Sequence, residues 1–378
     1  MKKAVLVPDS FKGTLSSTQV CEIIGGKIKE HFPDCQVVSI PVADGGEGSV
    51  DCFLAAVGGE KVRAFVKNPY FEDMESFYGI IDNGNTAVIE MAACAGLPLA
   101  EGRRDPGRTT TFGVGQLILD AASRGVKRII IGLGGSCTND GGCGAAAAAG
   151  VKFRNARGEE FVPVGGTLHN IAEIDISGKA DILAGIEIIT MCDIDNPMYG
   201  PAGAAHVFGP QKGADPEMVA ALDEGIRHLS EMIKTSLNMD LSEIPGTGAA
   251  GAMGAGMMAF FDSRLQMGID TVLDAVNFSS VASGADVVFT GEGRIDNQSL
   301  RGKVVTGVAK RARKLCIPVI VIAGGADYGM EEAYELGVTA VFTVNRLPEA
   351  FETSRRKSKE NLEFAADNIM RLIKCIGG

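Results

Sequence analysis

The stretch AVLVPDSFKGTLSSTQVCEIIGGKI, residues 4–28, decides the fold that we expect for the N-terminal part of this chain. Its first four residues are an unbroken apolar run, which is typical of a buried strand. Ser16 and Gln19 then form a capping box, the pattern with which a helix begins. A second unit of the same kind follows, with a strand at 36–42 and a helix at 47–57. Two successive strand–helix units predict a parallel, doubly wound sheet.

The same alternation of strand and helix returns near the C-terminus. Apolar runs at 286–289, 318–323 and 338–344 predict three strands that are separated by helical stretches. The central part of the chain differs, because strands expected at 75–81 and 86–91 flank an Asp-Asn-Gly-Asn turn. This pattern is typical of a β-hairpin, which a purely parallel sheet does not contain.

We therefore expect an α/β protein with two domains. A Rossmann-like domain with a doubly wound parallel sheet is expected from residues 1–65 and 283–378, and a second, mixed α/β domain from residues 66–282, inserted into the first. The chain length of 378 residues agrees with this division, since one hydrophobic core rarely fills so long a chain. No pattern in the sequence predicts an oligomeric state.

The composition excludes several classes of partner. The net charge of −11 argues against nucleic acid. No apolar run reaches the roughly 18 residues that span a membrane, and the first residues do not resemble a secretory signal. The nine cysteines contain no C-x-x-C pair, so we expect reduced thiols in a cytoplasmic protein.

Segments rich in Gly and Asp recur next to the expected strands. In α/β proteins, ligands bind in the loops at the carboxyl ends of the strands. Gly allows the backbone to approach a ligand closely, and Asp holds metal ions or accepts a proton. Such loops together predict a cleft for a phosphorylated, metal-bound ligand. The segments are residues 8–13, 42–49, 132–142, 192–197 and 290–299.

The charged residues of these loops each have a functional and a structural interpretation. Asp193 and Asp195 are two residues apart, so in an extended segment both carboxylates face one side and could share Mg²⁺, or form an Asx-turn instead. Lys12 could contact a phosphate or simply be solvated. Arg294 could clamp a carboxylate or phosphate, although a structural ion pair would have the same sequence pattern.

Other motifs argue against common classes of enzyme. Residues 246–251, GTGAAG, fit the dinucleotide-binding pattern, but no clear strand precedes them, so a close-packed Gly/Ala helix start is the favoured interpretation. The P-loop pattern G-x-x-x-x-G-K-[ST] is absent. None of the four histidines lies in the Gly/Asp loops, which disfavours a Ser–His or Cys–His hydrolase.

Taken together, these segments resemble the bacterial glycerate kinase family of the type that lacks a P-loop. The resemblance implies ATP-dependent phosphorylation of D-glycerate at the 2-hydroxyl, and a Rossmann-like domain plus an inserted α/β domain with the site between them. The matching stretches run in family order from residue 7 to about residue 325: VPDSFKGTLSS, PVADGGEGS, TTTFGVGQLI, IGLGGSCTNDGGCG, CDIDNPMYGPAGAAHVFGPQKGA, GTGAAGAMGAG and FTGEGRIDNQSLRGK.

For a kinase of this family, phosphoryl transfer requires charge neutralisation, positioning and a base for the attacking hydroxyl. We assign the Mg²⁺ ligands to Asp193 and Asp195, with Asp296 as a further candidate. Asp296 is also the first candidate for the catalytic base, and Asp193 is the second. Lys12 and Arg294 are expected to contact phosphate or the glycerate carboxylate.

The cofactor ATP is assigned to two glycine loops. Gly134, Gly135 and Ser136 are expected to present backbone N–H groups to an anion at the start of an alanine-rich helix. Gly291 and Gly293 belong to the last Gly/Asp loop and are assigned to the same role. Phosphorylation of the 3-hydroxyl or of a related small hydroxy acid is the main alternative, followed by a nicotinamide-dependent oxidoreductase and a non-catalytic sensor of organic acids.

Overall fold

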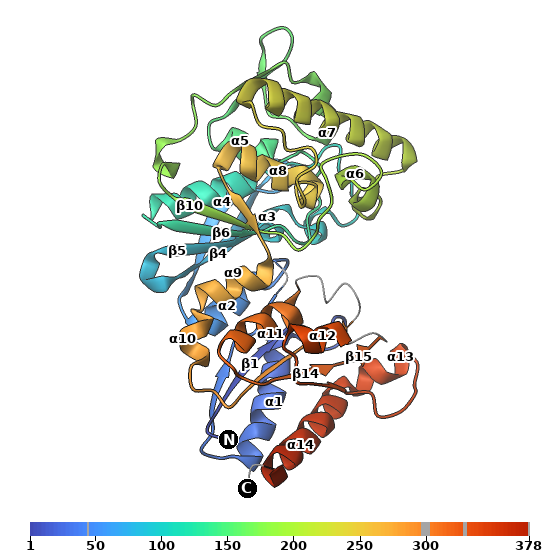
Figure 1. The fold of residues 1–378 in the computed structure, drawn as a ribbon. Coiled ribbons are helices and arrows are strands. Elements are labelled where there is room, and N and C mark those ends of the chain that lie inside the picture. The colour runs from blue at the N-terminus through green and yellow to red at the C-terminus, as the bar shows by residue number, and fades with distance from the viewer. Residues whose placement is uncertain (44, 296–302, 328–330, 377–378) are drawn as a thin grey trace. The chain divides into compact units, whose positions relative to one another are not determined.

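The structure is a computed structural model, and the chain forms two units in it (Figure 1). These units are defined by contacts within the structure, whereas a domain is a part of the chain that can fold by itself. The domain division expected from the sequence therefore stays a prediction. The structure describes residues 1–43, 45–295, 303–327 and 331–376. Unit 1 contains residues 1–44, 51–57 and 267–378, and unit 2 contains residues 45–50 and 58–266.

Unit 1 contains a five-stranded sheet in which all neighbouring strands are parallel. Its order, β16-β14-β12-β1-β2, means that the chain adds strands on one side of β1 first and then on the other. The doubly wound sheet expected from the sequence is therefore confirmed. The strands are β1 (Lys3–Pro8), β2 (Gln36–Ser39), β12 (Val287–Gly291), β14 (Val319–Ala323) and β16 (Ala340–Thr343).

Helices cover the sheet of unit 1. Side chains of α1 and α14, including Ile24 and Ile369, form one core with Leu6 and Phe289 of the strands. α1 begins with the expected capping box at Ser16. The elements outside the sheet are α1 (Ser17–His31), α2 (Ser49–Val57), α9 (Gly268–Ala275), α10 (Phe278–Ala282), β13 (Arg294–Ile295), α11 (Val304–Lys314), β15 (Gly325–Ala326), α12 (Glu331–Leu336), α13 (Phe351–Ser354), η6 (Arg355–Lys357) and α14 (Ser358–Ile376).

Unit 2 contains a six-stranded mixed sheet in the order β11-β10-β6-β5-β4-β3. The strands from β11 to β5 are parallel, whereas β4 is antiparallel to β5 and to β3. The expected hairpin is thus confirmed as β4 and β5. The strands are β3 (Glu60–Lys67), β4 (Asp73–Ile81), β5 (Thr86–Glu90), β6 (Arg128–Gly132), β10 (Glu187–Met191) and β11 (Arg264–Gln266).

The remaining elements of unit 2 pack around this sheet. One large core joins it to helices α4, α7 and α8 through side chains such as Leu117, Ile131, Ile226 and Met253. Among the described residues, no helix is both long and apolar enough to cross a membrane. These elements are η1 (Asp82–Gly84), α3 (Ala92–Ala95), η2 (Leu97–Ala100), α4 (Phe112–Ser123), α5 (Cys143–Ala148), β7 (Lys152–Arg154), β8 (Glu160–Phe161), η3 (Gly165–Asn170), β9 (Glu173–Asp175), η4 (Asp181–Leu183), α6 (Ala204–Phe208), η5 (Pro210–Lys212), α7 (Pro216–Leu237) and α8 (Ala249–Phe261).

Candidate functional site

The carboxyl ends of three parallel strands meet at one edge of the sheet in unit 2. In the register of β5, β6 and β10, Glu90 and Met191 both lie opposite Gly132. Ligands of sheets with parallel strands bind at this edge, in the loops that follow the strands. The loop 133–142, which follows β6, is therefore the centre of the candidate site in unit 2.

Two glycine-rich loops are packed against each other at this edge. The Gly134 amide donates to the Gly45 carbonyl at 3.0 Å. A Cβ atom on Gly132 would lie 2.2 Å from the same carbonyl oxygen, so a residue with a side chain does not fit there. The packing also brings the Glu47 carboxylate to within 3.9 Å of the position of a Cβ on Gly135. An acid of one loop thus lies next to the backbone of the other.

The start of α5 is occupied by a carboxylate of the protein itself. Asp140 is fully buried and accepts hydrogen bonds from the Thr111 amide and hydroxyl, at 2.7 and 2.8 Å, and from the Gly142 and Gly144 amides, both at 3.2 Å. Burial raises the pKa of Asp140, although these hydrogen bonds lower it. The Gly142 and Gly144 amides are therefore engaged and do not offer an anion site at the start of this helix.

Lys212 is a buried cation beside the same loop. Its side chain is 2% exposed, and its ammonium group donates to the Ser136 hydroxyl at 2.8 Å and to the Thr138 carbonyl at 2.7 Å. No carboxylate of a described residue lies within 4 Å of it. Burial lowers the pKa of Lys212 to about 8. Asp140 and Cys137 raise this pKa from farther away, but neither is a direct partner of the ammonium group. A buried ion without a directly paired counter-ion costs several kcal/mol, so this arrangement needs an explanation.

Several polar groups of the loop are unpaired. Within the part of the chain that the structure describes, the Asn139 carboxamide and the Thr138 hydroxyl are buried without a hydrogen-bond partner. The backbone N–H groups of Ser136, which is buried, and of Gly135, which is exposed, also have no acceptor among the described residues. An unpaired buried polar group costs about 1–3 kcal/mol, and such groups are often satisfied by water or by a ligand.

The two aspartates assigned to the metal follow β10. Asp193 is half-buried and Asp195 is exposed. Both carboxylates raise the pKa of Cys192, although burial is the larger cause of its rise to about 11. The Asn196 side chain donates to the Ala202 carbonyl at 2.7 Å and so holds the turn that follows. Both carboxylates thus lie in the loop that follows Cys192, and their shared role as metal ligands stays a prediction.

The described residues contain no group of three or more His, Cys, Asp or Glu side chains that could hold a metal ion. Mg²⁺ does not require such a group, because it usually keeps several waters and is bound by one or two carboxylates together with substrate phosphates. The oxygen donors of Asp193 and Asp195 match this preference.

In unit 1 the loops after β1 and β12 meet where the strand order reverses. A Cβ on Gly293 would lie 3.2 Å from the Lys12 amide nitrogen, and one on Gly291 would lie 1.8 Å from the Ile322 carbonyl oxygen. The loop of Gly293 is thus in direct contact with the loop of Lys12, and Gly291 at the end of β12 is packed against β14. The point at which the strand order reverses is where doubly wound sheets bind their ligands.

Arg294 belongs to the same group of loops. Its guanidinium donates to one oxygen of Asp327 at 2.7 and 3.0 Å, and 70% of its side chain is exposed. From the sequence, Arg294 could either clamp a ligand or form a structural ion pair, and the structure contains such an ion pair. Asp296, the first candidate for the base, lies outside the described residues.

The segment 246–251 serves packing within the protein. A Cβ on Gly251 would lie 2.2 Å from the Thr138 carbonyl oxygen. Ala250, Gly251 and Ala252 all have left-handed backbone conformations, which are strained for alanine. No strand precedes the segment, since residues 238–248 form turns or irregular structure. The helix-start interpretation is confirmed by α8, and a dinucleotide site here is disfavoured.

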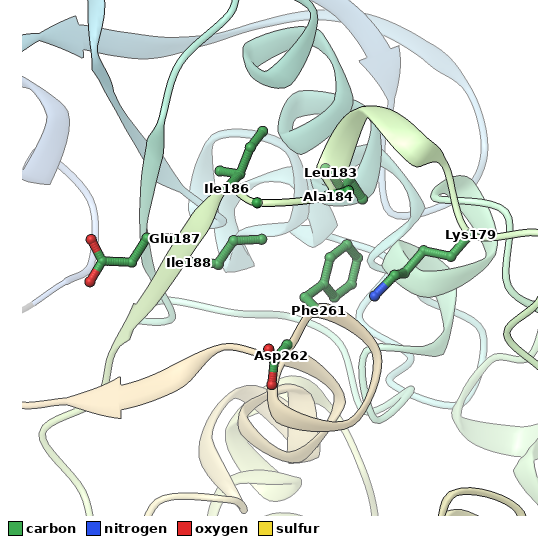
Figure 2. Close-up of a pocket in the computed structure, with 9 residues that line it drawn as sticks. Lys179, Leu183, Ala184, Ile186, Glu187, Ile188, Phe261 and Asp262 are labelled. Atoms are coloured by element: carbon green, nitrogen blue, oxygen red, sulfur yellow. The ribbon is translucent and has the colours of Figure 1, made fainter.

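A pocket of about 400 Å³ lies at the opposite ends of the strands in unit 2 (Figure 2). Its lining includes Ile186 and Ile188 at the start of β10, together with Lys179 and Phe261. Figure 2 shows that the Glu187 side chain points away from Phe261. Because the pocket is at the amino ends of the parallel strands, we do not regard it as the active site.

Sequence reasoning missed Lys212, Asn139 and Glu90 as candidate residues. Glu90 is 4% exposed and accepts a hydrogen bond from the Val50 amide at 3.2 Å. Lys212 lies in the stretch HVFGPQKGA, which carried part of the family resemblance, and that was its only signal in the sequence. Its role depends on Ser136, which is 76 residues away along the chain.

Comparisons with known proteins agree on one family. The model of the glycerate kinase family matches residues 4–374. A relative from Bacillus cereus, named glycerate kinase, is 45% identical over 98% of both chains. A relative from Escherichia coli, named glycerate 2-kinase, is 44% identical over 97% of both chains. A crystal structure from Salmonella typhimurium LT2, of a protein assigned as glycerate kinase 2, is similar with a TM-score of 0.87 and 40% identity, and the match covers 99% of this chain and 98% of that one.

Proposed function

The chain belongs to the glycerate kinase family, and we propose that it transfers the terminal phosphoryl group of ATP to the 2-hydroxyl of D-glycerate, giving 2-phosphoglycerate and ADP. The observation that carries this function is the near-complete match to the family and to a glycerate 2-kinase. The chain is accordingly a phosphotransferase, and its small-molecule substrates are glycerate and ATP.

We assign Asp193 and Asp195 to Mg²⁺. Two carboxylates two residues apart in the loop after β10 support this assignment, because they supply the oxygen ligands that Mg²⁺ prefers. When bound, Mg²⁺ neutralises negative charge on the phosphoryl groups. Asp193 is also our second candidate for the base that accepts the proton of the attacking hydroxyl.

The other predicted residues lie in unit 1. Lys12 and Arg294 are cations in loops at the point where the strand order reverses, and we assign them to a phosphate or to the glycerate carboxylate. Gly291 and Gly293 let these loops approach their neighbours, which supports a role in binding the nucleotide. Asp296 remains our first candidate for the catalytic base.

We also propose that the enzyme works in the cytoplasm. All nine cysteines are free, and seven of them are buried or half-buried. Free thiols that are not paired in disulfides are typical of proteins in a reducing compartment.

The first test is turnover. Incubation with D-glycerate, ATP and Mg²⁺ is expected to release ADP, and ³¹P and ¹H NMR of the product is expected to show phosphate on carbon 2. Phosphate on carbon 3 would contradict the 2-kinase assignment. Glycerate binding without ADP release would favour a sensor or a kinase of another hydroxy acid.

The second test addresses the carboxylates. We expect Asp193→Asn and Asp296→Asn each to lower kcat by roughly 10²-fold or more, the usual size for loss of a general base or of a metal ligand. Asp262→Asn is the matched control, because Asp262 lines the pocket at the other ends of the strands and Asn tolerates its left-handed backbone. Near-normal kcat in both site variants would show that the assignment is wrong.

A further inference from the structure

The ammonium group of Lys212 is enclosed by neutral partners. The two acceptors given above are a hydroxyl and a carbonyl, and together they use two of its three N–H groups. The nearby Asp140 carboxylate is already shared among four donors from Thr111, Gly142 and Gly144. The fold of unit 2 therefore holds a buried positive charge with no carboxylate of a described residue in direct contact, although Asp140 acts on it from farther away.

This charge is not needed to fill space. A methionine has nearly the same length and would fill the same site without the cost of desolvating an ammonium ion. Other lysines of unit 2, such as Lys234, meet a carboxylate at the surface, where the charge costs little. A buried cation that no carboxylate of a described residue contacts directly is thus suited to a negatively charged ligand.

Further hydrogen-bond donors belong to the loop that holds this cation. Because the Ser136 hydroxyl accepts from Lys212, its own proton is directed elsewhere and can be donated. The amides of Gly135 and Ser136 have no acceptor among the residues that the structure describes. The Asn139 carboxamide, which is fully buried, is also without a partner within the described residues. These groups belong to one loop at the carboxyl end of β6.

We propose that Lys212 and residues Gly135, Ser136 and Asn139 form a binding site for an oxyanion of the substrates. The inference rests on the proposed function, which supplies two oxyanions of suitable chemistry, the carboxylate of glycerate and a phosphate of the nucleotide. Each oxygen of such a group accepts hydrogen bonds from cations and N–H groups, which matches the donors of this site. Lys212 supplies the charge, and Ser136 and the backbone set the orientation.

The variant Lys212→Met tests this site, with Lys179→Met as the matched control. Lys179 lines the pocket at the opposite ends of the strands, so its loss removes a lysine without touching the loop. Titration calorimetry would measure the binding of D-glycerate, of ADP and of inorganic phosphate to each protein. Steady-state kinetics would give the KM for glycerate and for ATP separately.

We expect Lys212→Met to keep or raise the melting temperature. We also expect it to lower the affinity for one of the substrates by roughly 10- to 100-fold, the size of a lost charge-assisted hydrogen bond. A lower affinity for glycerate with an unchanged affinity for ADP would assign the site to the carboxylate of glycerate. Lower affinities for ADP and inorganic phosphate with an unchanged affinity for glycerate would assign the site to a phosphate of the nucleotide. Lys179→Met should leave the affinities for both substrates within twofold of those of the original protein.

Two results would overturn the proposal. One is a folded Lys212→Met protein whose affinities for glycerate and ADP both stay within twofold. If Lys212→Met does not fold, Ser136→Ala decides, because it removes the orienting hydroxyl and keeps the charge, and unchanged affinities in that variant would be the second result. Binding is measured without turnover, so failure of this site is distinct from failure of the original protein to phosphorylate glycerate.

Discussion

The candidate cations of unit 1 are exposed, whereas the candidate cation of unit 2, Lys212, is buried. In unit 1, Lys12 is exposed and Arg294 forms a surface ion pair with Asp327. In unit 2, Lys212 and Asp140 are enclosed by the protein. A surface charge costs little free energy and can be replaced at little cost to stability. A buried charge is costly, so its presence is informative about function. Its replacement by an apolar side chain of similar size is expected to raise the free energy of unfolding.

The largest effect is expected for substitutions that test how tightly the loops are packed. A Cβ on Gly251 in unit 2 would lie 2.2 Å from the Thr138 carbonyl oxygen, and Gly251 has a positive φ of 69°. Gly13 in unit 1 has a φ of 77°, but nothing lies within 4 Å of its Cβ position. We expect Gly251→Ala to lower the free energy of unfolding by about 3 kcal/mol or more, and Gly13→Ala by about 1 kcal/mol.

Urea unfolding followed by circular dichroism would measure both glycine variants under the same conditions. The Gly13 variant is the control for backbone strain alone, because it has the same strained φ without the steric contact. Equal losses in the two variants would mean that the loop of unit 2 can move away from the added methyl group. The contrast in packing between the two units would then be wrong.

The intermediate effect is a dependence of stability on pH. Lys212 has a pKa lowered by burial from its ordinary 10.5 to about 8. Between these values the folded protein has released the proton while the unfolded chain still holds it, so the contribution of Lys212 to stability rises with pH. The gain is up to about 1.4 kcal/mol for each pH unit of this interval.

The comparison that isolates this effect is the difference in unfolding free energy between Lys212→Met and the original protein. We expect the variant to be the more stable below pH 8 and the difference to shrink toward pH 10.5. Of the neighbouring groups, Cys137 has a pKa raised to about 12 by burial, so its thiol does not change charge in this interval. A difference that does not vary with pH would show that Lys212 is not a buried cation.

Local sequence patterns predicted the elements whose formation depends on near neighbours. The capping box of Ser16 and Gln19 marked the start of α1, and the turn after Ile81 marked the hairpin of β4 and β5. Exposed charges such as Arg294 could be assigned as candidates from the sequence, because they lie in loops that follow the predicted strands. In these cases the deciding residues are close together along the chain.

The buried part of the candidate site could not be predicted in this way. Ser136 and Lys212 are 76 residues apart, and Thr111 and Asp140 are 29 residues apart, so only the fold brings each pair together. The left-handed turn of Ala250 and Ala252 also contradicts what alanine ordinarily favours. There, tertiary packing against the 138–139 backbone outweighs local preference.

The smallest effect on stability is expected in unit 1, for Arg294→Ala. Its ion pair with Asp327 is largely exposed, so its loss should change the free energy of unfolding by less than about 1 kcal/mol. If Arg294 contacts a phosphate or the glycerate carboxylate, as we propose, kcat/KM should nevertheless fall by roughly 10-fold or more, the size of a lost charge-assisted hydrogen bond. Asp327→Ala is the matched control, because it breaks the same pair and keeps the guanidinium. An unchanged kcat/KM in Arg294→Ala would mean that the pair with Asp327 has only a structural role. The exposure of this charge in unit 1 would then not indicate a function.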